Sequence, residues 1–137
     1  MTTEITDLHY ERVRAAFGTV AYARFLGLEM CEIEGQTAIC LDVRDELKQN
    51  HGVVHGGAIA SLIDTASAFA ILVLQQENEK VTTTDLTIHY LRPVTSGQMI
   101  AVAKIVRAGR RRFVVSVEVR NNGAVIATAI TGYVRIG

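Results

Sequence analysis

The sequence is poor in features that mark several classes of protein. It has no tryptophan, one proline and two cysteines, Cys31 and Cys40, which lie on neighbouring apolar segments without CxxC spacing. Lysine plus arginine and aspartate plus glutamate number 14 each, so no net charge favours nucleic acid or an anionic membrane surface as partner. The first ten residues lack the basic-then-apolar pattern of a secretory signal. We therefore expect a reducing cytoplasm as the location and no nucleic-acid partner.

The sequence also lacks an apolar run long enough to cross a bilayer. The run from 58 to 74, AIASLIDTASAFAILVL, is shorter than the roughly 20 residues of a spanning helix, and it contains Asp64 and several hydroxyl side chains. We therefore expect no membrane role. The chain does have 49% hydrophobic residues in a length of 137, which is enough to bury a core without disulfides or metal ions. A single domain over 1–137 and no metal site are expected.

The hydrophobic pattern divides the chain into helices and strands. Residues 7–26 predict one or two short amphipathic helices, 27–44 a β-hairpin, and 45–57 an irregular loop that leads into the apolar helix. Four more strands, predicted to form an antiparallel meander, cover 81–91, 98–107, 112–120 and 124–136. Asn122-Gly123 predicts a tight turn between the last two. A curved sheet wrapped around the apolar helix satisfies this order, because such a helix must be buried on most sides.

Asp64 is the one charge within the apolar helix. An ionised carboxylate in apolar surroundings costs several kcal/mol unless hydrogen bonds or an opposite charge compensate. On a helical wheel Asp64 shares one face with small and hydroxyl side chains, namely Ala60, Ser61, Ser67 and Ala68, while bulky residues occupy the other face. Catalysis is one explanation. The structural alternatives are that Asp64 orders the helix through local hydroxyls or makes a polar contact in a homodimer interface.

His55, Gly56 and Gly57 directly precede the helix. The glycines lie where backbone N–H groups and the positive end of the helix dipole suit a developing oxyanion, although tight packing at the junction explains them equally well. His55 lies nine positions before Asp64, about 180° around the helix and roughly 13 Å along its axis. The two therefore cannot serve one substrate atom within one chain. If both belong to one site, a second subunit must bring its His55 loop to Asp64, which predicts a composite site in a homodimer.

The segment 50–64, NHGVVHGGAIASLID, resembles the signature of hotdog-fold acyl-CoA thioesterases of the phenylacetate-degradation (PaaI-like) type. Segments 85–93, DLTIHYLRP, and 107–112, RAGRRR, are similar to family segments in the same order. The resemblance implies an α+β hotdog fold, with a curved antiparallel sheet around a long central helix and short N-terminal helices. It also implies a homodimer, often paired into a homotetramer, that hydrolyses an acyl-CoA to a carboxylic acid and coenzyme A. Coenzyme A is then part of the substrate, and no separate cofactor is expected.

The resemblance also implies roles for single residues. Asp64 matches the family's catalytic carboxylate, as general base or nucleophile, and Gly56 matches the glycine whose amide polarises the thioester carbonyl. His55 matches the histidine that organises this loop. Two further matches leave a neighbour as the alternative: the loop asparagine is Asn50 or else Gln49, and the assisting hydroxyl on the strand after the helix is Thr83 or else Thr84.

Arginines of the 107–112 segment are expected to contact the phosphates of coenzyme A. A guanidinium group makes paired, charge-assisted hydrogen bonds to phosphate, whereas the structural alternative is a solvated turn. The arginines concerned are Arg107, Arg110, Arg111 and Arg112.

Two other functions stay open on the same fold. One is a non-catalytic module that binds acyl-CoA and regulates. The other is a hydratase or dehydratase, which also handles acyl thioesters with a carboxylate and a histidine. The spacing from His55-Gly56-Gly57 to Asp64 favours hydrolysis.

Overall fold

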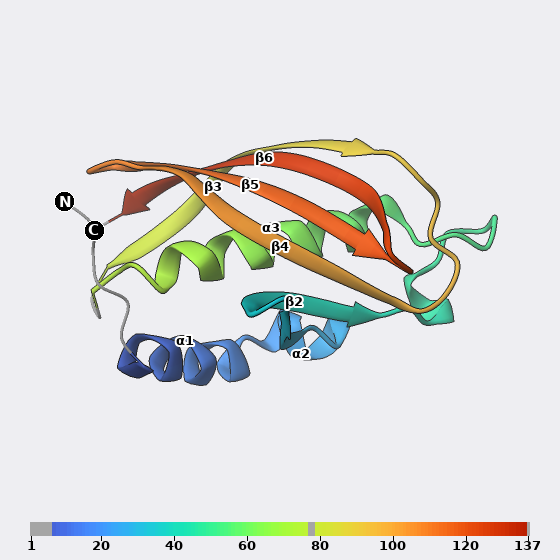
Figure 1. The fold of residues 1–137 in the computed structure, drawn as a ribbon, viewed down its shortest axis with the longest axis horizontal. Coiled ribbons are helices and arrows are strands. Elements are labelled where there is room, and N and C mark those ends of the chain that lie inside the picture. The colour runs from blue at the N-terminus through green and yellow to red at the C-terminus, as the bar shows by residue number, and fades with distance from the viewer. Residues whose placement is uncertain (1–6, 77–78, 137) are drawn as a thin grey trace.

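The computed structural model describes residues 7–76 and 79–136, without the side chains of Asp7 and His9. The ends of the predicted apolar helix and of the last four predicted strands agree with the structure to within two residues. Residues 1–6 and 137 of the predicted domain lie outside the described residues. The elements, in chain order, are α1 (Asp7–Thr19), α2 (Ala21–Leu26), β1 (Glu29–Ile33), β2 (Gln36–Asp42), the 3-10 helix η1 (Asp45–Leu47), α3 (Gly56–Leu72), β3 (Lys80–Tyr90), β4 (Gln98–Ala108), β5 (Arg112–Asn121) and β6 (Ala124–Ile136) (Figure 1).

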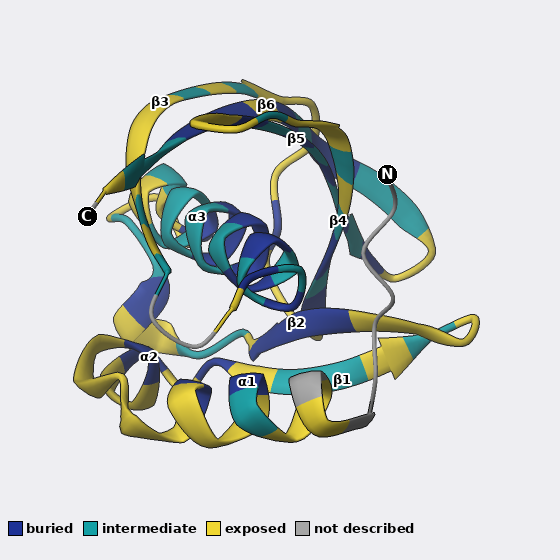
Figure 2. Ribbon diagram, turned by 90° about the vertical axis from the view of Figure 1, so that its left-hand side faces the viewer, coloured by how far each residue is buried: buried dark blue, intermediate teal, exposed yellow. Residues whose placement is uncertain are grey.

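A six-stranded antiparallel sheet curves around α3, as the sequence predicts (Figure 2). Leu62, Ile63 and Ile71 of α3 have no exposed surface, because strands of the sheet enclose the helix. Helices α1 and α2 lie on the outer side of the β1–β2 hairpin. The hotdog arrangement expected from the resemblance is therefore confirmed.

The predicted meander of the last four strands is wrong in one connection. The strand order is β1-β2-β4-β5-β6-β3, so β3 pairs with β6 and not with β4. The connection 91–97 contains Pro93 and is too long for a tight hairpin. It crosses the end of the sheet and places β3 at the far edge, where the strand closes over α3. The β5–β6 turn is as predicted: Asn122 and Gly123 have φ angles of 51° and 80°.

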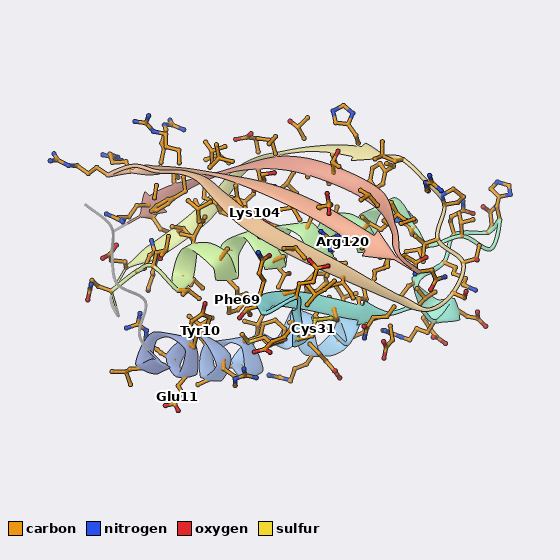
Figure 3. All side chains as sticks on the ribbon, viewed as in Figure 1. Tyr10, Glu11, Cys31, Phe69, Lys104 and Arg120 are labelled. Atoms are coloured by element: carbon orange, nitrogen blue, oxygen red, sulfur yellow. A yellow bond between two sulfur atoms is a disulfide. The ribbon has the colours of Figure 1, made fainter. Side chains whose placement is uncertain are left out.

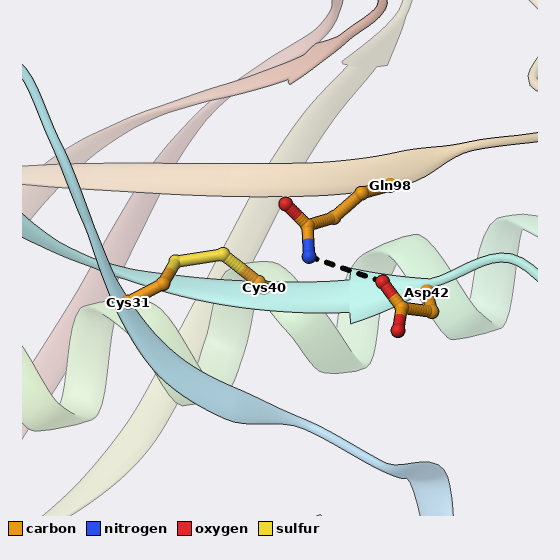
Figure 4. The surroundings of a disulfide bond; sticks show 4 residues. All are labelled: Cys31, Cys40, Asp42 and Gln98. Atoms are coloured by element: carbon orange, nitrogen blue, oxygen red, sulfur yellow. Dashed lines mark hydrogen bonds between the residues drawn. A yellow bond between two sulfur atoms is a disulfide. The ribbon is translucent and has the colours of Figure 1, made fainter.

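Cys31 and Cys40 form a disulfide between β1 and β2, with their Cα atoms 6.2 Å apart (Figure 4). The sequence alone did not predict this pair. The expected cytoplasmic location rested in part on unpaired cysteines. It stays a prediction, and the cysteines no longer support it. Within the described ranges, none of the helices has the length and apolar character needed to cross a bilayer.

Candidate functional site

Asp64 lies in the middle of α3, half-buried, beneath the β3–β6 edge of the sheet. Two hydroxyl groups donate to the same carboxylate oxygen, Oδ1: Thr83 Oγ1 at 2.8 Å and the Tyr133 phenol at 2.5 Å. The Tyr133 oxygen also lies 2.9 Å from the Asp64 backbone carbonyl. In the part of the chain that the structure describes, no donor reaches Oδ2. One oxygen of Asp64 is therefore held in place while the other is available to a substrate or water.

A β-bulge places Thr83 over Asp64. Thr83 pairs with Tyr133, and the register shifts between Thr83 and Asp85, so that Thr84 is the extra residue of β3. A bulge re-aims side chains beside a site. Here Thr83 points to α3, whereas Thr84 donates to Asp85 at 2.7 Å. Of the two threonines considered from the sequence, Thr83 is the one that contacts Asp64.

Tyr133 was not predicted from the sequence. Its side chain is only 2% exposed, and burial, followed by the hydrogen bond to Asp64, raises the pKa of the phenol above its usual value. Tyr133 therefore remains a hydrogen-bond donor at neutral pH. A phenol on the inner side of a strand is a detectable signal, since a buried hydroxyl needs a partner. The signal could not be used because β6 was not expected beside β3.

The face of α3 that carries the small and hydroxyl side chains packs against other elements. Ser67 is fully buried and lies 3.0 Å from the Thr131 hydroxyl of β6. Ser61 is half-buried, lies 2.8 Å from the Tyr22 hydroxyl of α2 and donates to the Gly57 carbonyl. This face therefore contacts both the sheet and α2, instead of being left free for a ligand along its whole length.

His55 is the N-cap of α3. Its Nδ1 accepts a hydrogen bond of 2.8 Å from the Gly57 N–H. Because Nδ1 is the acceptor, the neutral ring carries its proton on Nε2, which can donate to a ligand. His55 thus caps α3 at the loop-to-helix junction.

Gly56 keeps an amide that the cap does not use. Gly57 donates to His55, whereas the Gly56 N–H has no acceptor among the described residues. The Gly56 carbonyl accepts from the Tyr90 hydroxyl at 2.8 Å, and a Cβ at position 56 would lie 3.3 Å from the Tyr90 side chain. Gly56 therefore permits close packing of Tyr90. A cleft of about 280 Å³, bordered by both residues, opens beside the glycine.

The loop before α3 distinguishes between Gln49 and Asn50. The Gln49 side chain accepts from the His51 N–H, and its backbone closes the turn through Val53 and Gly52. Asn50 is exposed and makes no hydrogen bond to the described part of the chain. Gln49 is thus engaged inside the turn, while the Asn50 amide remains available.

These residues do not converge within one chain. In Figure 1 the loop before α3 projects at the right end of the molecule, beyond the N-terminus of α3, and the β4–β5 turn lies at the left end. Arg112 pairs with Val134, next to the Phe113–Tyr133 pair, so the arginine turn lies at the end of the sheet nearer Tyr133. All four arginines, Arg107, Arg110, Arg111 and Arg112, are exposed. The structure therefore brings together Asp64, Thr83 and Tyr133, and it keeps the loop of Asn50, His55 and Gly56 apart from the arginines.

Comparison with known proteins agrees with this architecture. The family model of the thioesterase superfamily matches residues 51–127. A putative esterase of Mycobacterium tuberculosis is 34% identical over 98 residues, which are 69% of this chain and 70% of that protein. The acyl-coenzyme A thioesterase PaaI of Escherichia coli is 27% identical over 114 residues, covering 82% of this chain and 79% of PaaI.

Solved structures give the same result. The E. coli PaaI structure superposes with a TM-score of 0.87 at 24% identity, over 98% of this chain and 97% of the other. The BH2602 protein of Bacillus halodurans, solved with CoA, has a TM-score of 0.81 at 26% identity, over 95% and 90% of the two chains. The chain belongs to the thioesterase superfamily and, among its hotdog-fold members, to the PaaI-like type.

Proposed function

We propose that this protein is an acyl-CoA thioesterase in which Asp64 is the general base or the nucleophile. The observation that carries the proposal is the asymmetric hydrogen bonding of the Asp64 carboxylate. Thr83 and Tyr133 fix Oδ1 and so orient the group, and Oδ2 is left to act on water or on the thioester carbon. Oδ2 accepts no hydrogen bond from the described residues and is not a buried atom, so it is accessible to water and to a substrate.

The oxyanion donor is the Gly56 amide, supplied by a second subunit. Within one chain Gly56 begins α3 and Asp64 follows about 12 Å further along the helix axis, while Asp64 itself is only half-buried. Among the described strands, β3 pairs on one side only, so it offers a free edge next to the Asp64 face of α3. A two-fold axis near β3 brings the partner's Gly56 towards Asp64 and produces two identical composite sites. A homotetramer pairs two such dimers.

The reaction then follows from these groups. Asp64 Oδ2 takes a proton from water as the hydroxide attacks the thioester carbon, and the Gly56 N–H stabilises the oxygen that gains charge. When the tetrahedral intermediate collapses, the C–S bond breaks and the coenzyme A thiolate leaves, to be protonated by Asp64 or solvent. In the nucleophilic route Oδ2 attacks the carbon itself, the thiolate leaves, and water hydrolyses the resulting anhydride. Asn50 and the His55 Nε2–H hold the thioester or the water.

The exposed arginines of the β4–β5 turn hold the phosphates of coenzyme A. They lie at the end of the sheet nearer Tyr133, and Arg112 begins β5, the strand that pairs with the Tyr133 strand β6. PaaI, named an acyl-coenzyme A thioesterase, and the BH2602 structure with CoA support this substrate class.

Hydrolysis of a panel of acyl-CoAs, followed by release of free thiol, tests the proposal. We expect Asp64→Asn to lower kcat/KM by about 10²–10⁴-fold, the range for loss of a general base. Asp42→Asn is the matched control, since Asp42 is an exposed aspartate on β2 that accepts from Gln98 at 3.0 Å. Asp42→Asn should retain wild-type activity. Equal rates for wild type and Asp64→Asn would reject the catalytic assignment.

Product analysis separates the remaining functions. Incubation with an enoyl-CoA and with a 3-hydroxyacyl-CoA should release coenzyme A without interconverting the two thioesters. Interconversion with the thioester intact would identify a hydratase or dehydratase, and saturable binding without any turnover would identify a binding module.

A further inference from the structure

A second cavity lies on the side of α3 that faces away from Asp64. It has a volume of about 420 Å³ and is lined by α1, α3, the β1–β2 hairpin and β4. Its wall is mostly apolar, and the side chains from α3 and β4 include several alanines, which leave the space open. Ala66, Phe69 and Val73 border it from α3. They lie about 140–200° around the helix from Asp64, so the cavity is separate from the candidate catalytic site.

The cavity opens where the sheet is incomplete. Strands β2 and β4 pair only between residues 39–42 and 98–101, although β4 continues to Ala108. Beyond Ala101 the two strands separate. Exposed polar residues border the cavity there, with Gln36 and Thr37 on β2 and Lys104 on β4. Tyr10, Phe69 and Lys104, which border the cavity from three elements, are labelled in Figure 3.

Among the residues that the structure describes, Lys104 is the only charged residue that borders the cavity. It belongs to none of the ion pairs that the described residues form. An apolar cavity with one unpaired cation at its border suits a ligand with an alkyl chain and one anionic end. At roughly 30 Å³ per water-sized group and a packing density of about 0.75, the cavity holds a chain of about ten carbon atoms.

We propose that this cavity binds a medium-chain fatty carboxylate, with the alkyl chain between α1, α3 and β4 and the carboxylate at Lys104. A charge-assisted hydrogen bond to the ammonium holds the head group, and the alkyl chain replaces water on apolar wall atoms. The site is independent of the proposed hydrolysis, because no residue of the Asp64 site borders it.

Calorimetric titration with decanoate tests the proposal, with 1-decanol as the uncharged analogue. We expect saturable binding of one decanoate per wild-type chain. Lys104→Gln should weaken decanoate binding by about tenfold or more, as expected for the loss of a charge-assisted hydrogen bond, and leave decanol binding unchanged. Lys80→Gln, which alters another exposed lysine, should change neither affinity.

Two variants that fill the cavity, Ala70→Leu and Ala103→Leu, test where the alkyl chain of the ligand lies. Each should reduce the affinity for both ligands by at least tenfold, with near-ultraviolet circular dichroism showing that the fold is retained. Asp64→Asn should bind decanoate with the same affinity as the wild type. The binding experiment therefore gives the same answer whether or not the protein is a thioesterase. Two results would overturn the proposal. One is the absence of saturable binding to the wild type. The other is binding that is lost in Asp64→Asn but unchanged in Lys104→Gln and in the two cavity-filling variants.

Discussion

At the scale of single residues, two hydroxyl groups determine the orientation of the Asp64 carboxylate. A carboxylate in a buried helix needs compensation, and Thr83 and Tyr133 supply it from two adjacent strands. Both hydroxyls contact Oδ1, so the compensation is confined to one oxygen. The structural alternative for Asp64 requires hydrogen bonds such as these two. Catalysis also requires an oxygen without a donor, and Oδ2 has none among the described residues.

From the raised pKa of Tyr133 we predict how the free energy of unfolding changes at alkaline pH. Because the folded protein raises the pKa of this phenol, the unfolded chain loses the proton first, near the usual tyrosine value of about 10. The stabilisation is complete below that pH and decreases as pH rises towards the folded pKa, by up to about 1.4 kcal/mol per pH unit. Urea unfolding of wild type and Tyr133→Phe between pH 9 and 11 should show the free energies of unfolding converging as pH increases.

Tyr10→Phe is the control for this measurement. Tyr10 is partly exposed on α1 and donates no hydrogen bond within the described residues. Its variant should follow the wild-type curve, offset by a constant. A constant difference for Tyr133→Phe as well would show that the buried phenol does not contribute to the alkaline dependence.

We predict that substitutions of His55 affect the stability of the fold and the activity of the protein separately. His55→Ala removes the N-cap acceptor and should lower the free energy of unfolding by about 0.5–2 kcal/mol, whereas His55→Asn retains a capping oxygen. If the Nε2–H contacts the substrate, both variants lose activity while only the alanine variant loses stability. Thermal unfolding and thiol release measure the two effects. Full activity of His55→Asn would reduce His55 to a capping residue.

At the scale of elements, the β1–β2 hairpin carries a cross-link that predicts redox-dependent stability. The disulfide joins residues nine apart, and a loop of this size corresponds to a stabilisation of about 2–3 kcal/mol. Reductant should lower the free energy of unfolding by that amount in the wild type and leave a Cys31→Ser/Cys40→Ser double variant unchanged. Equal denaturation midpoints for the wild type with and without reductant would contradict the prediction.

At the scale of the whole molecule, the proposed site is divided between two ends of the fold. The loop with Gly56 lies at one end of α3, and the arginine turn lies at the other end of the sheet. In the proposed dimer, a second copy related by a two-fold axis supplies the missing half of each site.

Mixing two inactive variants tests this division. Asp64→Asn and Gly56→Pro each disable one half of the site. Proline removes the amide donor and suits the backbone at the first position of a helix, although the Tyr90 side chain must shift slightly to accommodate it. In a heterodimer one of the two sites contains neither substitution, so mixed chains should recover up to about a quarter of wild-type activity by random pairing of subunits. Light scattering and subunit exchange, measured on labelled chains, serve as controls. Exchange without recovery would argue against a shared site.

The sequence by itself determined the helices and most strands and singled out Asp64, because periodicity, Asn-Gly turns and a lone charge are local properties. It also located His55 and Gly56 at the start of α3. Only the tertiary structure decided that β3 lies beside β6, and with it that Thr83 and Tyr133 meet at Asp64. Strand order depends on how the sheet closes over the helix, and the disulfide between Cys31 and Cys40 depends on how β1 aligns with β2. Neither is encoded in a local pattern, since each arises from packing between segments distant along the chain or from the register of neighbours.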